Sequence, residues 1–179
     1  MTVVGRLLVE HALGEADRHP GDGRGAADHW AALADALIER HGFKVILTGS
    51  ASEQSIGDAI VSRMRQRPIV LVGETSVDEL LAVLARCELV ISGDSGPLHL
   101  AVALGRPTVS IYGPTDPAIY GPAPRPGQPA VVIRRGLHCS PCYTLRAAAD
   151  CPYGRPSCML DVTVQQVLRA AVDSVRQAT

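Results

Sequence analysis

The chain has 179 residues, which is enough for one domain with its own hydrophobic core. Hydrophobic residues make up 46% and charged residues 20%, and 17 basic against 18 acidic residues leave a formal net charge of −1. This balance, without a run of Lys and Arg, excludes a typical nucleic-acid-binding protein. The apolar N-terminal stretch is interrupted by Arg6 and Glu10, which argues against a signal peptide or a transmembrane segment, so we expect a cytoplasmic protein.

Residues 1–25 show no clean period, and His19–Gly25 consists of turn-forming residues, so the sequence predicts an irregular N-terminal segment. The domain is expected over residues 26–179. Its first helix has one apolar face, formed by Trp30, Leu33, Ala34, Leu37, Ile38 and His41. Gly42 ends this helix, and Phe43–Thr48 is rich in strand-forming residues.

The same helix–strand unit then repeats. The predicted helices cover residues 52–65, 76–87 and 97–104, and the strands after them cover residues 69–72, 89–92 and 108–112. Ser76 and Glu79 form a capping box, and Pro97 fits a first helical turn. Residues 130–133 add a further strand, and Thr163 caps a last helix. This alternation predicts a Rossmann-like α/β domain with a parallel sheet and helices on both faces.

Ligands of such a sheet bind beyond the carboxyl ends of its strands. Here those ends are rich in glycine, and a glycine lets the backbone approach a ligand or turn sharply. The segments concerned are Thr48–Ser50, Gly73–Glu74, Gly93–Gly96 and Gly113–Asp116. Gly73 alone is best interpreted as an ordinary turn.

The segment Ser92–His99 (SGDSGPLH) allows two interpretations. In the first, the strand ends, a tight turn follows, and the unpaired amides of the next helix hold a phosphate group, with Ser95 and His99 as additional donors. In the second, Asp94 or Ser95 is a plain helix cap and His99 is a surface residue. Spacing alone leaves both open.

The stretch Asp94–Pro117 (DSGPLHLAVALGRPTVSIYGPTDP) resembles the signature of glycosyltransferase family 9, which contains the ADP-heptose:lipopolysaccharide heptosyltransferases. The stretch Val45–Glu53 (VILTGSASE) and the four later cysteines support this resemblance. It covers most of the chain, roughly from Trp30 to Val175. The similarity is to the second, donor-binding domain of a two-domain GT-B enzyme, so the resemblance implies the C-terminal half of such an enzyme.

The resemblance implies an inverting transfer from a nucleotide-diphospho-sugar, such as ADP-heptose, to a lipopolysaccharide core or a related glycan. The acceptor hydroxyl attacks the anomeric carbon, and the domain stabilises the departing diphosphate with preorganised donors, without a catalytic cofactor. The expected donor-binding residues are Thr48, Gly49, Glu53, Asp94, Ser95, Gly96, His99, Gly113, Pro114 and Thr115. Within this set, Asp94, Ser95, Gly96 and His99 would surround the diphosphate and the sugar. Glu53 would reach the ribose, and Gly113–Thr115 would close the site.

The sequence departs from the family pattern in two respects. The family's general base is a carboxylate of the N-terminal domain, which has no counterpart in this sequence, so we expect no catalytic residue in this chain. The family also places a basic residue between an HPG motif and the Trp of the first helix. Here HPG stands at His19–Gly21 and only Arg24 follows, at a short spacing.

Four of the five cysteines form the pattern C-x2-C-x8-C-x6-C within an insert at residues 136–161, at Cys139, Cys142, Cys151 and Cys158. A long irregular segment needs another source of stability. One structural zinc or iron ion held by four thiolates would supply it, folding the insert away from the donor site. Free thiols or a redox pair are the alternatives, and some family members carry a comparable cluster. Cys87 is expected in the core.

Three functions remain for comparison. The first is a glycosyltransferase, or its donor-binding half, which would act with a separate acceptor domain and could associate peripherally with the inner membrane. The second is a non-catalytic nucleotide-binding or interaction module. The third is a nucleotide-sugar epimerase, for which only Glu53, Asp94 and His99 offer acid–base groups in the crevice.

Overall fold

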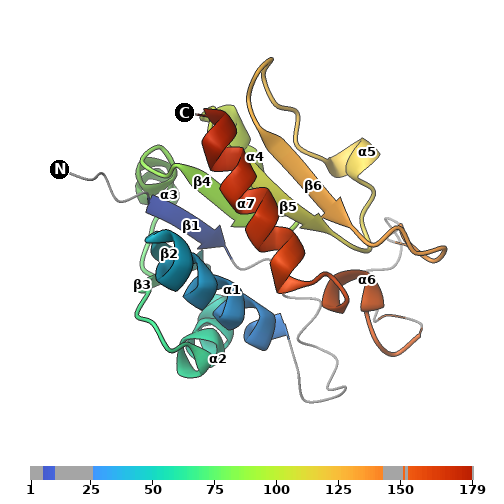
Figure 1. Ribbon diagram of the computed structural model, residues 1–179, viewed down its shortest axis with the longest axis horizontal. Coiled ribbons are helices and arrows are strands. Elements are labelled where there is room, and N and C mark those ends of the chain that lie inside the picture. The colour runs from blue at the N-terminus through green and yellow to red at the C-terminus, as the bar shows by residue number, and fades with distance from the viewer. Residues whose placement is uncertain (1–5, 11–25, 143–150, 152, 179) are drawn as a thin grey trace.

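The computed structural model describes residues 6–10, 26–142, 151 and 153–178. Its centre is one six-stranded sheet (Figure 1), in which every paired strand runs parallel to its neighbour. The strands are β1 (Arg6–Glu10), β2 (Lys44–Gly49), β3 (Ile69–Val72), β4 (Leu89–Ser92), β5 (Thr108–Tyr112) and β6 (Ala130–Arg134). Their order is β3-β2-β1-β4-β5-β6, which is the arrangement of a doubly wound Rossmann sheet. The predicted fold class is confirmed.

Strand β1 corrects the expectation that residues 1–25 are irregular. Arg6–Glu10 lies between β2 and β4, in the middle of the sheet, so the domain includes residues before Ala26. A central parallel strand needs no alternation of apolar and polar residues, because both of its faces are covered. The apolar triplet Leu7–Val9 is also too short to give a periodic signal by itself.

One face of the sheet is covered by α1 (Ala26–His41), α2 (Gln54–Arg63) and α7 (Val164–Ala178). Figure 1 shows α1 and α7 side by side in front of the strands. Trp30 and Leu37 of α1 pack with Leu168 of α7 in the larger hydrophobic core. The opposite face carries α3 (Val77–Leu84) and α4 (Gly96–Ala103), whose Leu84 and Ala101 form a second, smaller core.

The helix ends follow the expected local chemistry. Ser76 and Glu79 form the predicted capping box of α3, with the Ser76 amide donating to Glu79 Oε2 at 2.8 Å and the Glu79 amide to Ser76 Oγ at 3.3 Å. Gly42 takes a φ of 68° directly after α1, which favours glycine. Thr163 caps α7 through its hydroxyl, at 3.3 Å from the Gln166 amide.

Two predicted helices are shorter in the structure. The helix expected over residues 52–65 is divided into the 3-10 turn η1 (Ala51–Glu53) and α2, and α3 ends three residues before Cys87. Two short helices complete the described elements: α5 (Pro117–Tyr120) and α6 (Ser157–Leu160). None of the described helices is both long and apolar enough to cross a membrane.

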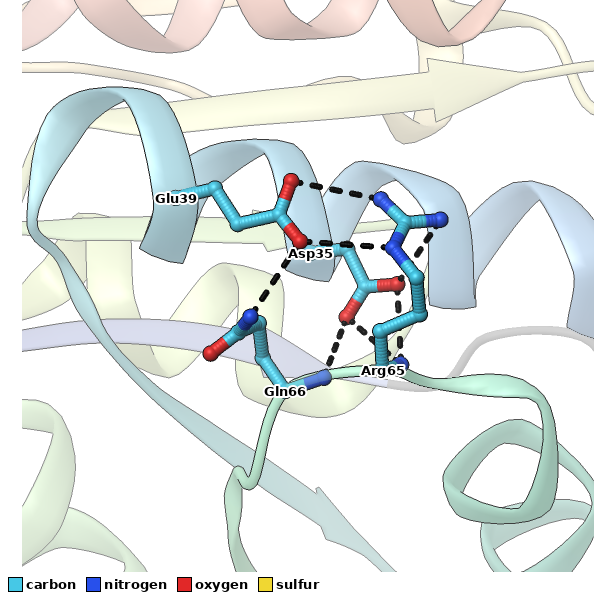
Figure 2. Close-up of polar contacts among 4 residues, drawn as sticks. All are labelled: Asp35, Glu39, Arg65 and Gln66. Atoms are coloured by element: carbon cyan, nitrogen blue, oxygen red, sulfur yellow. Dashed lines mark hydrogen bonds and ion pairs between the residues drawn. The ribbon is translucent and has the colours of Figure 1, made fainter.

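A buried carboxylate joins α1 to the connection between α2 and β3 (Figure 2). Asp35, only 1% exposed, accepts hydrogen bonds from the backbone amides of Arg65, at 3.0 and 3.1 Å, and Gln66, at 2.9 Å. The Arg65 guanidinium lies 3.6 Å from the same carboxylate, and it also pairs with Glu39 at 3.2 Å. The Asp35 carboxylate thus supplies acceptors for two backbone amides that lie in a connection, where no helix or strand provides them.

Candidate functional site

The strand order defines where a ligand would bind. The connections change direction between β1 and β4, and in doubly wound sheets the ligand crevice opens beyond the strand ends at that point. The turn Gly93–Ser95 follows β4 there directly. Thr48 and Gly49 end β2 on one side of the switch point, and Tyr112 ends β5 on the other. The predicted site segments therefore share one edge of the sheet.

Helix α4 begins at this edge with an N-terminus suited to an anion. Ser95 is its N-cap, and its hydroxyl accepts the Leu98 amide at 3.4 Å and contacts the Ser92 hydroxyl at 2.8 Å. Pro97 lies in the first turn, as predicted. A Cβ built on Gly96 would meet no atom within 4 Å, so the space beside the first turn is open. Amides at a helix N-terminus attract negative groups.

Asp94 and His99 are brought together beside this N-terminus. Nε2 of His99 lies 3.7 Å from Oδ1 of Asp94, and the two side chains are 48% and 22% exposed. Both side chains are therefore partly accessible beside the first turn of α4. Oδ1 of Asp94 also lies 3.3 Å from the hydroxyl of Tyr112, a residue that the sequence analysis does not include in the site. A buried tyrosine hydroxyl requires a polar partner, and this requirement is the signal by which the sequence could have indicated Tyr112.

The predicted residues of β2 lie deeper or make other contacts. The Thr48 side chain is 1% exposed, and its Oγ1 has no hydrogen-bond partner in the described structure. The Gly49 carbonyl accepts the Gly73 amide at 2.9 Å. Oε2 of Glu53 accepts bonds from the Ser50 amide at 2.7 Å and the Ser50 hydroxyl at 2.6 Å, so this oxygen caps η1. A ribose contact from Glu53 stays a prediction.

The loop after β5 is covered by the cysteine-containing insert. A Cβ on Gly113 would lie 2.7 Å from Met159 Cγ and 3.0 Å from Cys158 Sγ, so α6 packs directly on this glycine. The Ser140 hydroxyl donates to the Gly113 carbonyl, and the Cys142 amide donates to the Pro114 carbonyl at 2.8 Å. The expectation that the insert folds away from the donor-site segments is therefore wrong.

None of the four cysteines of the insert takes part in a disulfide. Burial is the main reason why the pKa of Cys158 is raised from 9.0 to about 11. The neighbouring thiols of Cys142, Cys151 and Cys139 raise it further. Cys142 is exposed, however, whereas Cys158 is buried. Across the described residues, no group of three or more His, Cys, Asp or Glu side chains is placed to hold one metal ion. The predicted structural zinc or iron site at these four cysteines is not supported.

The HPG motif at His19–Gly21 and Arg24 lie outside the described residues.

A family model for glycosyltransferase family 9, the heptosyltransferases, matches residues 25–151, which is most of the chain. The chain belongs to glycosyltransferase family 9. This membership favours a glycosyl-transfer site over an epimerase site in the crevice.

Known members of family 9 resemble this chain in sequence and in structure. Lipopolysaccharide heptosyltransferase 2 of Escherichia coli is 34% identical over 146 residues, which are 78% of this chain and 39% of that protein. The solved structure of the E. coli ADP-heptose lipopolysaccharide heptosyltransferase II is 28% identical, with a TM-score of 0.76, over 99% of this chain and 48% of that one. E. coli heptosyltransferase WaaC, solved with ADP, shares the fold at 24% identity, 97% and 46% coverage and a TM-score of 0.66. The chain thus spans less than half the length of these relatives.

Proposed function

We propose that this chain is the donor-binding half of a heptosyltransferase that acts in lipopolysaccharide or related glycan assembly, with ADP-heptose as the donor. The observation that carries the proposal is the open N-terminus of α4 at the topological switch point of the sheet. The names of the 34% and 28% identical relatives support the heptosyl donor and the lipopolysaccharide acceptor.

In this proposal the diphosphate lies against the first turn of α4. The amides there, the Ser95 hydroxyl and the imidazole of His99 would stabilise the negative charge that grows on the leaving ADP. Asp94 would accept hydrogen bonds from the sugar hydroxyls. Glu53 would contact the ribose, which requires the carboxylate to keep or exchange its bonds with Ser50.

Thr48 and Gly49 would form the floor of the crevice, and Pro114 and Thr115 would form its wall beyond β5. Gly113 would contribute indirectly, because it is packed beneath Met159. The general base and the acceptor site would come from residues corresponding to the other half of the longer relatives. A non-catalytic nucleotide-binding module would use the same donor site without such a partner.

Calorimetric titration of the chain with ADP and with ADP-heptose tests the donor site. Gly96→Val places a branched side chain in the open space beside the helix N-terminus and should weaken both affinities by at least about tenfold, or roughly 1.4 kcal/mol. Arg176→Ala is the matched control, because Arg176 lies in α7 with its side chain 75% exposed. Equal affinities for the two variants, or no binding by the unaltered chain, would contradict the proposal.

A further inference from the structure

Tyr112 is the last residue of β5, and only 1% of its surface is exposed. Its hydroxyl donates to the carbonyl oxygen of Tyr120, at the end of α5, over 2.7 Å. The same hydroxyl lies 3.3 Å from Oδ1 of Asp94, in the turn between β4 and α4. One buried hydroxyl therefore contacts both the turn that precedes α4 and the end of α5.

The hydroxyl has one proton and two acceptors. A phenol donates a single hydrogen bond, whereas the Tyr120 carbonyl and the Asp94 carboxylate both only accept. Burial and the nearby charge of Asp94 raise the pKa of Tyr112, so the proton stays on the phenol at neutral pH. Both acceptors lie within hydrogen-bond distance of the hydroxyl, the Tyr120 carbonyl at 2.7 Å and Oδ1 of Asp94 at 3.3 Å, so they share its one proton.

The carboxylate of Asp94 is contacted at one oxygen from two directions. Tyr112 lies behind Oδ1 in the protein interior, and Nε2 of the half-exposed His99 lies 3.7 Å from the same atom. The hydrogen bond from Tyr112 restricts rotation of the carboxylate, and the imidazole of His99 lies beside it. Restriction matters at this position, because a carboxylate that turns toward the N-terminus of α4 would repel a bound diphosphate, whereas a fixed one can accept hydrogen bonds from sugar hydroxyls.

We propose that Tyr112 is a positioning residue for the donor sugar: its hydroxyl holds Oδ1 of Asp94, which leaves Oδ2 to accept hydrogen bonds from the hydroxyls of a nucleoside-diphosphate-bound sugar. This inference rests on the proposed function. It assigns to Tyr112 a part in distinguishing the nucleotide sugar from the free nucleotide, since free ADP has no sugar at the position of Asp94. Preorganised groups contribute to affinity by avoiding the cost of ordering on binding.

The test compares Tyr112→Phe with Ser110→Ala. The Phe variant keeps the buried ring and removes only the hydroxyl. Ser110 lies two residues earlier in β5, is fully buried, and its hydroxyl donates to the Val131 carbonyl at 3.2 Å, away from the crevice. Each variant therefore loses one buried hydroxyl that donates to a backbone carbonyl, and a general loss of stability would affect both.

Two measurements are made on the full chain and on both variants. In calorimetry, Tyr112→Phe should weaken ADP-heptose binding by about fivefold to tenfold and ADP binding by less than about twofold, as expected for the loss of one hydrogen bond. In hydrogen exchange without ligand, amides of residues 94–99 and 118–121 should exchange faster in Tyr112→Phe than in Ser110→Ala.

The outcomes separate the two proposals. If the unaltered chain binds neither ligand, the proposed function fails, and the exchange measurement still decides whether Tyr112 fixes the two segments. Equal losses of ADP and ADP-heptose affinity in Tyr112→Phe would overturn the positioning role. Unchanged exchange at both segments in that variant would also overturn it.

Discussion

The backbone amide of Cys142 donates to the carbonyl oxygen of Pro114 at 2.8 Å. Together with the bond from the Ser140 hydroxyl to the Gly113 carbonyl, it attaches the cysteine-containing insert to the loop that follows β5. Helix α6 contacts the same loop through Met159 and Cys158. The insert therefore supports a segment of the proposed donor site, and a change within the insert can alter that site.

Substitution of Gly113 by Ala should destabilise the fold. A Cβ there would approach Met159 Cγ to 2.7 Å and Cys158 Sγ to 3.0 Å, so α6 must shift. Forcing extra volume into a packed site costs roughly 1–3 kcal/mol. Urea unfolding monitored by circular dichroism measures the loss. Gly96→Ala is the control, since its Cβ meets nothing within 4 Å, and its effect should stay within about 0.5 kcal/mol. Similar effects of the two substitutions would refute this packing.

The cysteines should differ strongly in reactivity. Cys142 is exposed, whereas Cys87 and Cys158 are 1% and 8% exposed. The thiolate is the reactive form, and a thiol with a pKa of about 11 has roughly one molecule in a thousand ionised at pH 8. Iodoacetamide followed by peptide mass spectrometry should label Cys142 well before Cys158 in the folded chain. Equal labelling rates for these two residues would contradict the described burial.

Cys158 should also make stability depend on pH in the alkaline range. Its pKa is about 11 in the folded chain against 9.0 as the reference, so the folded state retains the proton over a range where the unfolded state loses it. The contribution is complete below pH 9 and is lost as the pH rises toward 11. Melting temperatures at pH 7.5 and 10.5 should therefore fall more in the unaltered chain than in Cys158→Ala. A steeper fall in the variant would reverse the sign.

The sequence predicted the sheet where strands and turns carry strong local signals. The strands 69–72, 89–92 and 108–112 occur at the predicted residues, because each is a short apolar run bounded by turn residues or Pro. It missed β1, whose five residues include Arg6 and Glu10. Pairing with two neighbours, which is a tertiary contact, gives this strand its place.

The sequence predicted which segments meet at the candidate site, but it predicted fewer of the individual side-chain contacts. Asp94, Ser95, Gly96 and His99 gather at one helix N-terminus, as the motif indicates. The bond between Glu53 and Ser50 is a local capping box that the S-x-x-E spacing could have indicated. The cover over Gly113 and the contacts of Tyr112 join residues far apart in the sequence. Periodicity does not encode such contacts.

Asp35 should be far more important for stability than the ion pair beside it. Its buried carboxylate accepts the amides of Arg65 and Gln66, and Asp35→Ala leaves these donors without their partner at a cost of roughly 1–3 kcal/mol. Glu39→Ala removes a partly exposed ion pair with Arg65 and a hydrogen bond from the Gln66 side chain, and a clearly smaller loss is expected because solvent screens such surface contacts. Denaturant midpoints of both variants measure the difference. A larger loss for Glu39→Ala would show that the amide bonds are not the main contribution.

The chain as sole protein should bind donor without transferring sugar at a useful rate. It covers 39% of the sequence of E. coli lipopolysaccharide heptosyltransferase 2 and 48% of the chain in the solved structure of E. coli heptosyltransferase II. We place the general base and the acceptor site in the remaining part of such enzymes. A positioned base contributes typically about 10²–10⁴-fold to a rate, and acceptor positioning contributes a further large factor. Mass spectrometry of a heptose-free core acceptor incubated with ADP-heptose measures product. The positive control is a full-length heptosyltransferase, and product formed by the chain at a comparable rate would show that it contains a complete active site.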